Sequence, residues 1–291
     1  MSCPDCFSGS VHEGQPRGSI IKLHGLDTYL VEPQDGKPIK GIIVMIPEAF
    51  GWSFVNNRIL ADHYANKSSY RVYLPDFMLG HSAPPRLLGV VRSLSSSSIF
   101  MKPFYLAIAM VSFIPWIYYN RIARSYPVVK AFFTALRQSA PTSPTTNAPL
   151  PIGAAGFCWG GKHVVLLSQN ETTTLADGTN APLIDAGFTG HPSFLEIPGD
   201  IEKLTVPVSF AIAEKDHRVG PKEAEIIRGI VVDGPGFAQD DAKKGEVTVY
   251  EDAGHGFCVR ADVRSGTANV ARQAEEAEDQ CLRWFDRVFG V

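Results

Sequence analysis

A cysteine in a glycine-rich turn has the setting of a nucleophile in this chain. Cys158 lies in the sequence GFCWG (156–160), after an apolar segment and before a helical pattern. This is the context of a nucleophile elbow, whose glycines permit a sharp turn and close packing of strand and helix. The helix N-terminus would stabilise a thiolate, and the backbone N–H of Trp159 would bind an oxyanion. We predict that Cys158 is a nucleophile; the alternative is a small buried cysteine beside a close-packed helix.

Such a nucleophile needs a base, and the base needs an acid that orients it. Asp216 and His255 each come directly after an apolar segment that predicts a strand. The carboxyl ends of strands are where open α/β sheets place their sites. The chain order cysteine, aspartate, histidine is the order of elbow-type hydrolases. We therefore predict a catalytic triad of Cys158, Asp216 and His255.

Other polar residues offer alternatives to these assignments. His217 is an alternative to His255 as the base only if the assignment of predicted strands is shifted by one element. Asp252 and Glu251 could replace the predicted acid, but they precede the histidine and should point elsewhere. His163, on the helix after the elbow, is expected to pack or to face solvent. His191 follows a strand, and we expect it to line the substrate pocket.

Apolar segments bounded by turn residues recur along the chain and predict the strands of the core. The segment GIIVMIPE (41–48) is a continuous aliphatic run, which is typical of a strand covered on both faces. Helical patterns lie between the segments, and the final one (267–289) has an apolar and an acidic face. Strands that alternate with helices predict a mostly parallel α/β sheet in one domain of residues 1–291.

One apolar segment does not fit this alternation. Residues 103–120 contain no charge, lie between Lys102 and Arg121, and include Pro115. A membrane-spanning helix needs about 20 apolar residues, so the segment is at the lower limit of length. We predict an inserted helical lid at 86–126, with contact to a membrane or a partner, or a span, as alternatives. Three aromatic side chains of the lid are expected to bind substrate: Phe104, Phe113 and Trp116.

Composition excludes several classes of protein. The chain of 291 residues has a formal net charge of −3 and no long run of one sign, so no basic footprint for nucleic acid is present. An odd number of cysteines, five in a chain of this length, argues against a disulfide framework as the basis of the fold. The N-terminal sequence has no basic and apolar regions typical of a secretory signal. We expect a cytoplasmic protein.

Cys3 and Cys6 form a C-x-x-C pair at the start of the chain. Zinc would need about four ligands, and His12 is the one further candidate nearby. A thioredoxin-like pair would follow a strand and open a helix, whereas this one lies beside Pro4. We interpret the pair as part of a structural N-terminus, with a metal or redox role as the alternative.

Five short motifs are distributed along the chain. They are IPEAFGW (46–52), YLPDF (73–77), GFCWGG (156–161), AEKDHRV (213–219) and YEDAGHGFCVR (250–260). These motifs, in this order, make the chain resemble the dienelactone hydrolase family, the cysteine branch of the α/β-hydrolase fold. Cysteine at the elbow together with an early glutamate separates this family from ordinary esterases. The resemblance implies an α/β-hydrolase domain.

The resemblance implies roles for further residues. Glu48 would contact the resting thiol and take its proton when substrate arrives, and the N–H of Ala49 would be the second oxyanion donor. Arg260 matches an arginine that holds a substrate carboxylate, for which a guanidinium fork is suited; the alternative is a surface salt bridge. Phe50, in the same motif as Glu48, is expected to contact substrate. The second carboxylate-binding arginine of the family has no anchored counterpart, because that region is replaced by 86–124.

These observations predict a hydrolase that cleaves an ester, lactone or thioester, without metal or cofactor. The apolar insertion favours a small-molecule substrate bulkier than a dienelactone. An alternative is a lyase, isomerase or cyclase step on a polyketide-like or aromatic lactone in the same pocket. A second alternative is a non-enzymatic ligand-binding or membrane-associated protein. We expect a monomer or a homodimer.

Overall fold

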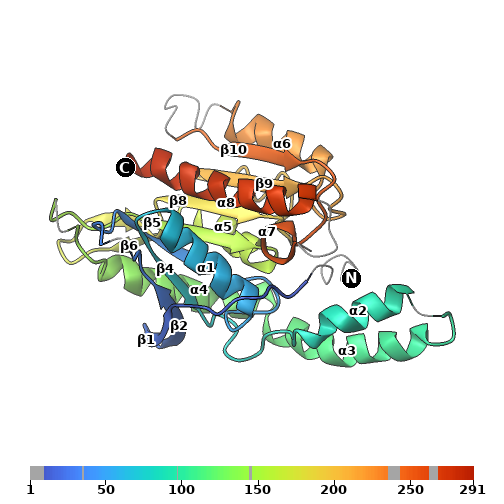
Figure 1. The fold of residues 1–291 in the computed structure, drawn as a ribbon. Helices are drawn as coiled ribbons and strands as arrows, with labels where there is room; N and C mark the ends of the chain where they lie inside the picture. The colour runs from blue at the N-terminus through green and yellow to red at the C-terminus, as the bar shows by residue number, and fades with distance from the viewer. Residues whose placement is uncertain (1–9, 35, 97, 144–145, 235–242, 262–267) are drawn as a thin grey trace.

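An eight-stranded sheet forms the centre of the computed structural model (Figure 1). Its order is β1-β2-β4-β3-β5-β8-β9-β10, with β1/β2 and β2/β4 antiparallel and the other pairs parallel. The predicted mostly parallel sheet is therefore confirmed. The strands are β1 Ser19–Leu23, β2 Leu26–Val31, β3 Gly41–Ile46, β4 Tyr70–Pro75, β5 Ile152–Phe157, β8 Ala186–Gly190, β9 Val208–Ala213 and β10 Glu246–Tyr250. The structure describes all residues except 1–9, 35, 97, 144–145, 235–242 and 262–267.

The central strands are apolar because helices cover both faces of the sheet. Every residue of β3, β5, β8 and β9 is buried, which confirms the interpretation of the continuous aliphatic run at 41–48. Helices α1 and α8 lie over one face of the sheet, and α4, α5 and α6 lie over the other (Figure 1). These helices are α1 Val55–Lys67, α4 Ile122–Gln138, α5 Trp159–Leu167, α6 Pro221–Val231 and α8 Ala268–Phe289.

Small elements complete the body of the molecule. Strands β6 (Thr172–Thr174) and β7 (Asn180–Pro182) pair antiparallel in a separate ribbon, which the sequence did not indicate. The short helix α7 (Phe257–Arg260) follows β10 and packs against α8 and α1. It carries Arg260, so the end of β10 leads directly to a residue of the predicted site.

The apolar segment and the residues before it form a helical hairpin, α2 (Arg86–Ser96) packed on α3 (Lys102–Tyr119). The hairpin projects from the body, and the turn between its helices is the part farthest from the sheet (Figure 1). Among the helices that the structure describes, none is by itself long and apolar enough to cross a membrane. Only α3 and α4 together meet that criterion, as a pair bent by 53°.

The base of the hairpin is tied to the body, in contrast to its far end. Trp116, in the last turn of α3, is buried and stacks on Phe113 with ring centroids 4.8 Å apart. Asn120, which follows α3, donates from Nδ2 to the carbonyl oxygen of His81 (2.8 Å). The indole N–H of Trp159 donates to the carbonyl oxygen of Asn120 (2.8 Å). The base therefore lies against the residue that follows Cys158.

Candidate active site

Cys158 lies in a strained turn between β5 and α5. Its φ of 51° and ψ of −111° are unfavourable for a residue with a Cβ, which is typical of strain held at functional sites. The turn is tight enough to need glycine on both sides. A Cβ on Gly160 would overlap the carbonyl oxygen of Ile46, and a Cβ on Gly156 would overlap the carbonyl of Gly160. The sequence thus builds a sharp strand-to-helix turn with a nearly buried thiol at its apex.

Asp216 and His255 meet at the carboxyl ends of β9 and β10. The Nδ1–H of His255 donates to Oδ2 of Asp216 at 2.6 Å, and both side chains are fully buried. The other carboxylate oxygen of Asp216 accepts the backbone N–H of Arg218 (2.9 Å). A backbone hydrogen bond from Lys215 to Ala253 (2.9 Å) joins the two loops. Because the Arg218 N–H holds one carboxylate oxygen of Asp216, the other oxygen keeps the His255 imidazole in a single orientation.

The chemistry of His255 depends on the sulfur of Cys158. Burial, the largest influence, lowers the pKa of His255, but the charge of Cys158 and hydrogen bonds with Asp216 and Cys158 raise it to about 10. A raised pKa means that the imidazole is protonated at neutral pH when the thiolate is present. The geometry can therefore support a thiolate–imidazolium pair, with Asp216 stabilising the charge on the ring.

Glu48 and Arg260 form a buried ion pair beside this group. The guanidinium Nε of Arg260 donates to Oε2 of Glu48 at 2.6 Å, and neither side chain has more than 1% of its surface exposed. The Arg260 guanidinium also lies over the ring of Phe50, 5.5 Å from its centroid. Gly256 has a φ of 93°, and a Cβ there would collide with the guanidinium of Arg260. The glycine after His255 therefore leaves room for the arginine.

The pKa of Glu48 is set by its burial. Burial is the largest influence and raises the pKa, whereas the positive charge of Arg260 lowers it and the charge of Cys158 raises it. The net result is a pKa of about 7. Within the described part of the chain, Oε1 of Glu48 is buried and has no hydrogen-bond partner. A carboxylate with one unpaired oxygen and a pKa near neutrality is suited to accept a proton.

The predicted oxyanion donors, Trp159 and Ala49, lie just after β5 and β3. Trp159 begins α5, so its N–H is one of the first helix amides, which have no intrahelical acceptor. Ala49 lies in the turn after β3, where Gly51 donates its N–H to the carbonyl oxygen of Glu48 (2.9 Å). Both residues are buried. Trp159 follows β5 itself, and Ala49 follows β3, the strand next to β5 in the sheet.

His191 is buried beside the triad. Its ring lies edge-on to His255, with centroids 4.9 Å apart, and it is fully inaccessible. Burial, and then the charges of His255 and Arg260, hold its pKa well below the usual range, so the ring is neutral. Neither ring nitrogen has a hydrogen-bond partner among the residues that the structure describes. The ring is neutral and buried against His255, and its contact with substrate stays a prediction.

Ser193 is a site residue that the sequence did not indicate. Its hydroxyl lies 3.6 Å from the sulfur of Cys158, and its backbone N–H donates to the carbonyl oxygen of Cys158 (3.0 Å). It belongs to the same post-strand sequence, HPS (191–193), that drew attention to His191. The location of Ser193 just after a predicted strand is the signal by which the sequence could have identified it.

The alternative acids and bases lie away from the triad. His217 is exposed. Asp252 is exposed and pairs with Lys215 at 2.7 Å, and Glu251 is also exposed. His163 is buried between Ser125 (Nε2 to Oγ, 2.9 Å) and the elbow helix, where burial lowers its pKa to about 4. His163 was expected either to pack or to face solvent. The structure shows that it packs, between α4 and α5.

The three lid aromatics occupy different surroundings. Trp116 is 5% exposed and belongs to the core, and Phe113 packs against the core beside it. Phe104 is 56% exposed. It belongs to the first turn of α3, at the end of the hairpin farthest from the sheet (Figure 1). The structure brings Trp116 near the elbow and does not bring Phe104 there.

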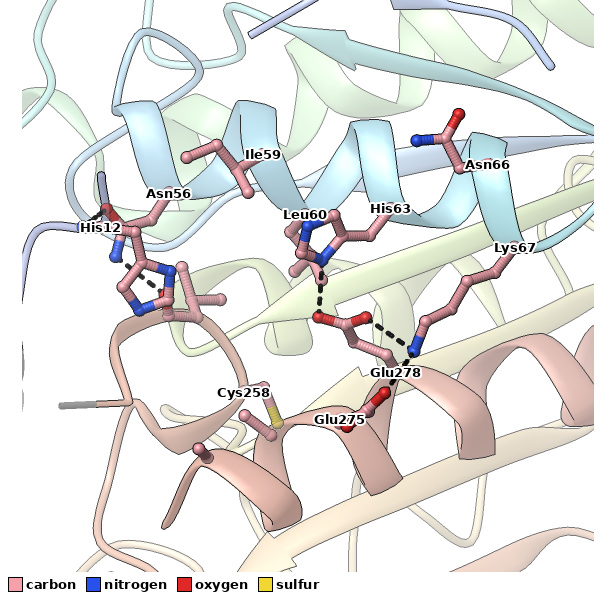
Figure 2. Close-up of a pocket in the computed structure, with 13 residues that line it drawn as sticks. His12, Asn56, Ile59, Leu60, His63, Asn66, Lys67, Cys258, Glu275 and Glu278 are labelled. Atoms are coloured by element: carbon pink, nitrogen blue, oxygen red, sulfur yellow. Dashed lines mark hydrogen bonds and ion pairs between the residues drawn. The ribbon is translucent and has the colours of Figure 1, made fainter. Parts of the chain in front are cut away.

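A cavity of about 390 Å³ lies between α1 and α8 (Figure 2). Its polar wall consists largely of ion pairs. Glu278 contacts His63 (3.1 Å) and Lys67 (3.2 Å), and Glu275 contacts Lys67 (3.7 Å). Cys258 lies at its other side, whereas Cys158, Asp216 and His255 do not line it. This cavity is therefore separate from the predicted catalytic residues.

Two predictions concern metal and the N-terminal cysteine pair. Cys3 and Cys6 lie outside the described residues. Among the residues that are described, no group of three or more histidine, cysteine or acidic side chains could hold a metal ion. The described cysteines 158, 258 and 281 are buried, and none of the three is in a disulfide bond.

Comparisons with known proteins place the chain among hydrolases. It is 26% identical over 282 residues to hydrolase pyvD of Aspergillus violaceofuscus, covering 97% of this chain and 95% of that one. It is 27% identical to dienlactone hydrolase 1 of Gibberella moniliformis, covering 88% and 82%. A putative dienelactone hydrolase from Klebsiella pneumoniae shares the fold, with a TM-score of 0.59, 17% identity and 92% and 97% of the two chains covered.

The family model for the dienelactone hydrolase family matches residues 26–289. The match runs from β2 to the end of α8 and includes every residue of the predicted site. Together with the shared architecture, it confirms the predicted α/β-hydrolase fold. The chain belongs to the dienelactone hydrolase family and is a hydrolase that cleaves ester bonds.

Proposed function

We propose that the protein hydrolyses a lactone, ester or thioester through Cys158, His255 and Asp216. The observation that carries the proposal is the buried triad itself: a cysteine with a φ of 51° at an elbow, and a 2.6 Å hydrogen bond between His255 and Asp216. A cysteine held in strain beside an oriented histidine is the arrangement that nucleophilic catalysis needs.

The first half-reaction makes an acyl-enzyme. The thiol proton of Cys158 passes to the carboxylate of Glu48, and the resulting thiolate attacks the substrate carbonyl carbon. The N–H groups of Ala49 and Trp159 bind the negative oxygen of the tetrahedral intermediate. When the intermediate collapses, the bond to the leaving oxygen or sulfur breaks, and protonated His255 donates a proton to it.

The second half-reaction returns the enzyme to its starting state. Neutral His255 takes a proton from water, whose oxygen attacks the thioester carbonyl. Collapse releases the acid and the Cys158 thiolate, which recovers its proton from Glu48. Asp216 stays ionised and holds the ring throughout. The thiol is neutral between turnovers, which protects it from oxidation.

The Glu48–Arg260 ion pair supports a gating role for the glutamate. Both groups are buried, so neither can be left without a partner at low cost. An anionic group on the substrate would compete with Glu48 for the Arg260 guanidinium. Glu48 would then be released toward the sulfur at the moment when substrate is present. Arg260 would thus bind substrate and trigger activation of the thiol.

The substrate is proposed to be bulkier and more apolar than a dienelactone. Phe50 lies under Arg260, His191 adjoins His255, and the Phe113–Trp116 stack sits at the base of the hairpin. The hydrogen bond from Trp159 to Asn120 connects that base to the elbow. We propose that the base of the insertion acts as the lid, and that a reducing compartment such as the cytoplasm keeps the thiol active.

Two measurements test the proposed function. The first is hydrolysis of p-nitrophenyl esters with acyl chains of two to twelve carbons, for which we expect activity that is lost in Cys158→Ala. The second is product analysis in H₂¹⁸O, in which hydrolysis places one solvent oxygen in the acid. A product without label would favour a lyase or isomerase step. Full activity of Cys158→Ala would contradict the proposed nucleophile.

A further inference from the structure

Helix α3 carries an exposed apolar surface that the hydrolase chemistry does not use. From Pro103 to Asn120 the helix and its end contain no charged residue. In α3 only Trp116 is buried. The side chains in contact with solvent include Val111 at 73% exposure, and the adjoining turn exposes Phe100 at 89%. Contiguous apolar surface of this kind marks an interaction site on a folded protein.

The apolar surface covers most of the helix circumference. At about 100° per residue, the exposed residues of α3 span an arc of about 220°. These residues are Phe104, Leu106, Met110, Val111, Ile114 and Ile117 with the two following tyrosines. A helix that packs on another protein uses a narrower stripe of about 100°. The acyl region of a membrane, in contrast, can contact every exposed side of the helix at once.

Charge around the hairpin has one sign. Between Asp76 and Glu171 the chain has eight lysines and arginines and no acidic residue. Three of the eight pair with acidic residues of the body, and the other five lie in the hairpin or next to it: the paired ones are Lys130, Arg137 and Lys162. Lys102 lies at one end of α3, and Arg121 and Arg124 lie just beyond the other. All three are exposed. Basic residues at both ends of an apolar helix complement anionic headgroups.

We propose that α3 docks on an anionic lipid surface, lying in the plane of the interface with its outer side among the acyl chains. The guanidinium groups of Arg121 and Arg124 lie over the ring of Tyr118, at 5.3 and 4.4 Å from its centroid. Tyrosine and arginine are side chains that favour the headgroup layer. Helix α4 stays with the body, because Phe132 and Phe133 belong to the core.

Co-sedimentation with vesicles tests this proposal. We expect the full chain to bind vesicles of phosphatidylcholine and phosphatidylserine (7:3) and to bind pure phosphatidylcholine vesicles more weakly. Since headgroup attraction is screened by salt, binding to the anionic vesicles should weaken in 0.5 M NaCl. Failure of the wild-type chain to sediment with anionic vesicles would overturn the proposal.

Matched variants separate the hairpin from the rest of the surface. The triple variant Phe100→Ser/Val111→Ser/Ile114→Ser should lower vesicle binding at least about tenfold, because each exposed apolar side chain adds to insertion. The control changes three exposed apolar residues outside the hairpin and should bind as the wild type does: Ile20→Ser/Leu79→Ser/Ile226→Ser. Both variants should keep their p-nitrophenyl acetate activity, so the result is independent of the proposed catalysis.

Charge reversal provides a second, independent readout. Arg121→Glu/Arg124→Glu should abolish the preference for phosphatidylserine, whereas Lys203→Glu/Lys222→Glu should retain it. The exposed surface of α3 could instead bind a second copy of the chain, and light scattering tests this by measuring the oligomeric state. A wild-type dimer that becomes a monomer in the triple serine variant, together with equal vesicle binding by both proteins, would overturn the proposal.

Discussion

At the elbow, polar side chains are buried and held in fixed positions, whereas on the α2–α3 hairpin apolar side chains are exposed. The Glu48–Arg260 and Asp216–His255 pairs have almost no accessible surface. Phe100, by comparison, has 89% of its surface in contact with solvent. Each region reverses the usual distribution of polar and apolar groups. Such reversals are costly for stability, so both are places to look for function.

The two regions differ in how firmly the fold fixes them. Around Cys158, glycines, backbone hydrogen bonds and ion pairs from β3, β5, β9 and β10 hold each group. The hairpin meets the body through its base, at Trp116 and Asn120. Substitutions at the elbow should therefore change chemistry or stability strongly, and substitutions far out on the hairpin should change neither.

The largest effect is expected for the nucleophile. Cys158→Ala should lower kcat/KM for p-nitrophenyl acetate by about 10⁴-fold or more, since loss of a nucleophile removes the covalent route. Cys281→Ala is the matched control, because Cys281 is an equally buried free cysteine on α8. It should keep its activity. A Cys158→Ala enzyme within tenfold of wild type would contradict the assignment, provided that its circular dichroism spectrum is unchanged.

The next effect concerns the buried ion pair. Arg260→Met should lower the free energy of unfolding by about 3–5 kcal/mol, because it leaves the Glu48 carboxylate buried and unpaired. Lys215→Met removes the exposed pair with Asp252 and should leave the free energy of unfolding nearly unchanged. Urea denaturation measures both. The double variant Glu48→Gln/Arg260→Met should lose less than the sum of its single variants, and an additive result would show that the two groups are not coupled.

Much of the elbow region could be predicted from sequence because its signals are local. The glycines around Cys158, and the strand ends before Asp216 and His255, each follow from a few neighbouring residues. The Glu48–Arg260 contact joins residues 212 positions apart, and the resemblance assigned them separate roles. Their pairing depends on how β3 and α7 pack, which no local pattern encodes. Ser193, by contrast, follows the end of β8 in the same HPS sequence as His191, so a local signal for it was present.

The hairpin shows the opposite limit of sequence reasoning. The segment 86–126, which includes the uncharged residues 103–120, was predicted to be helical, and the structure contains helices α2 and α3 there, whereas its role as an inserted lid stays a prediction. An uncharged helix has the same composition whether it covers a pocket or projects from the body. The direction in which the hairpin projects depends on its base, where Asn120 forms hydrogen bonds with His81 and Trp159. The structure accordingly distinguishes Trp116 from Phe104, which the sequence had treated as equivalent.

The pH dependence of activity tests whether Glu48 is the proton acceptor. The pKa of Glu48 is raised to about 7, and the carboxylate must be ionised to accept the thiol proton. We expect kcat/KM to rise about tenfold per pH unit below 7 and to level off above it. It should fall again toward pH 10, where His255 loses the proton that it donates. In Glu48→Gln the rise near pH 7 should disappear; a rise that persists would assign it to another group.

The smallest effects compare the two ends of the hairpin. Trp116→Phe keeps an aromatic ring against Phe113 but loses part of a buried side chain, and should cost about 1 kcal/mol of unfolding free energy. Phe104→Leu changes an exposed side chain and should stay within about 0.5 kcal/mol. If the base of the hairpin is the lid, Trp116→Phe should also change KM for a dodecanoyl ester relative to an acetyl ester, and Phe104→Leu should not. A KM change of equal size in both variants would mean that the whole hairpin closes over substrate, which would place the far end of α3 near Cys158 during turnover.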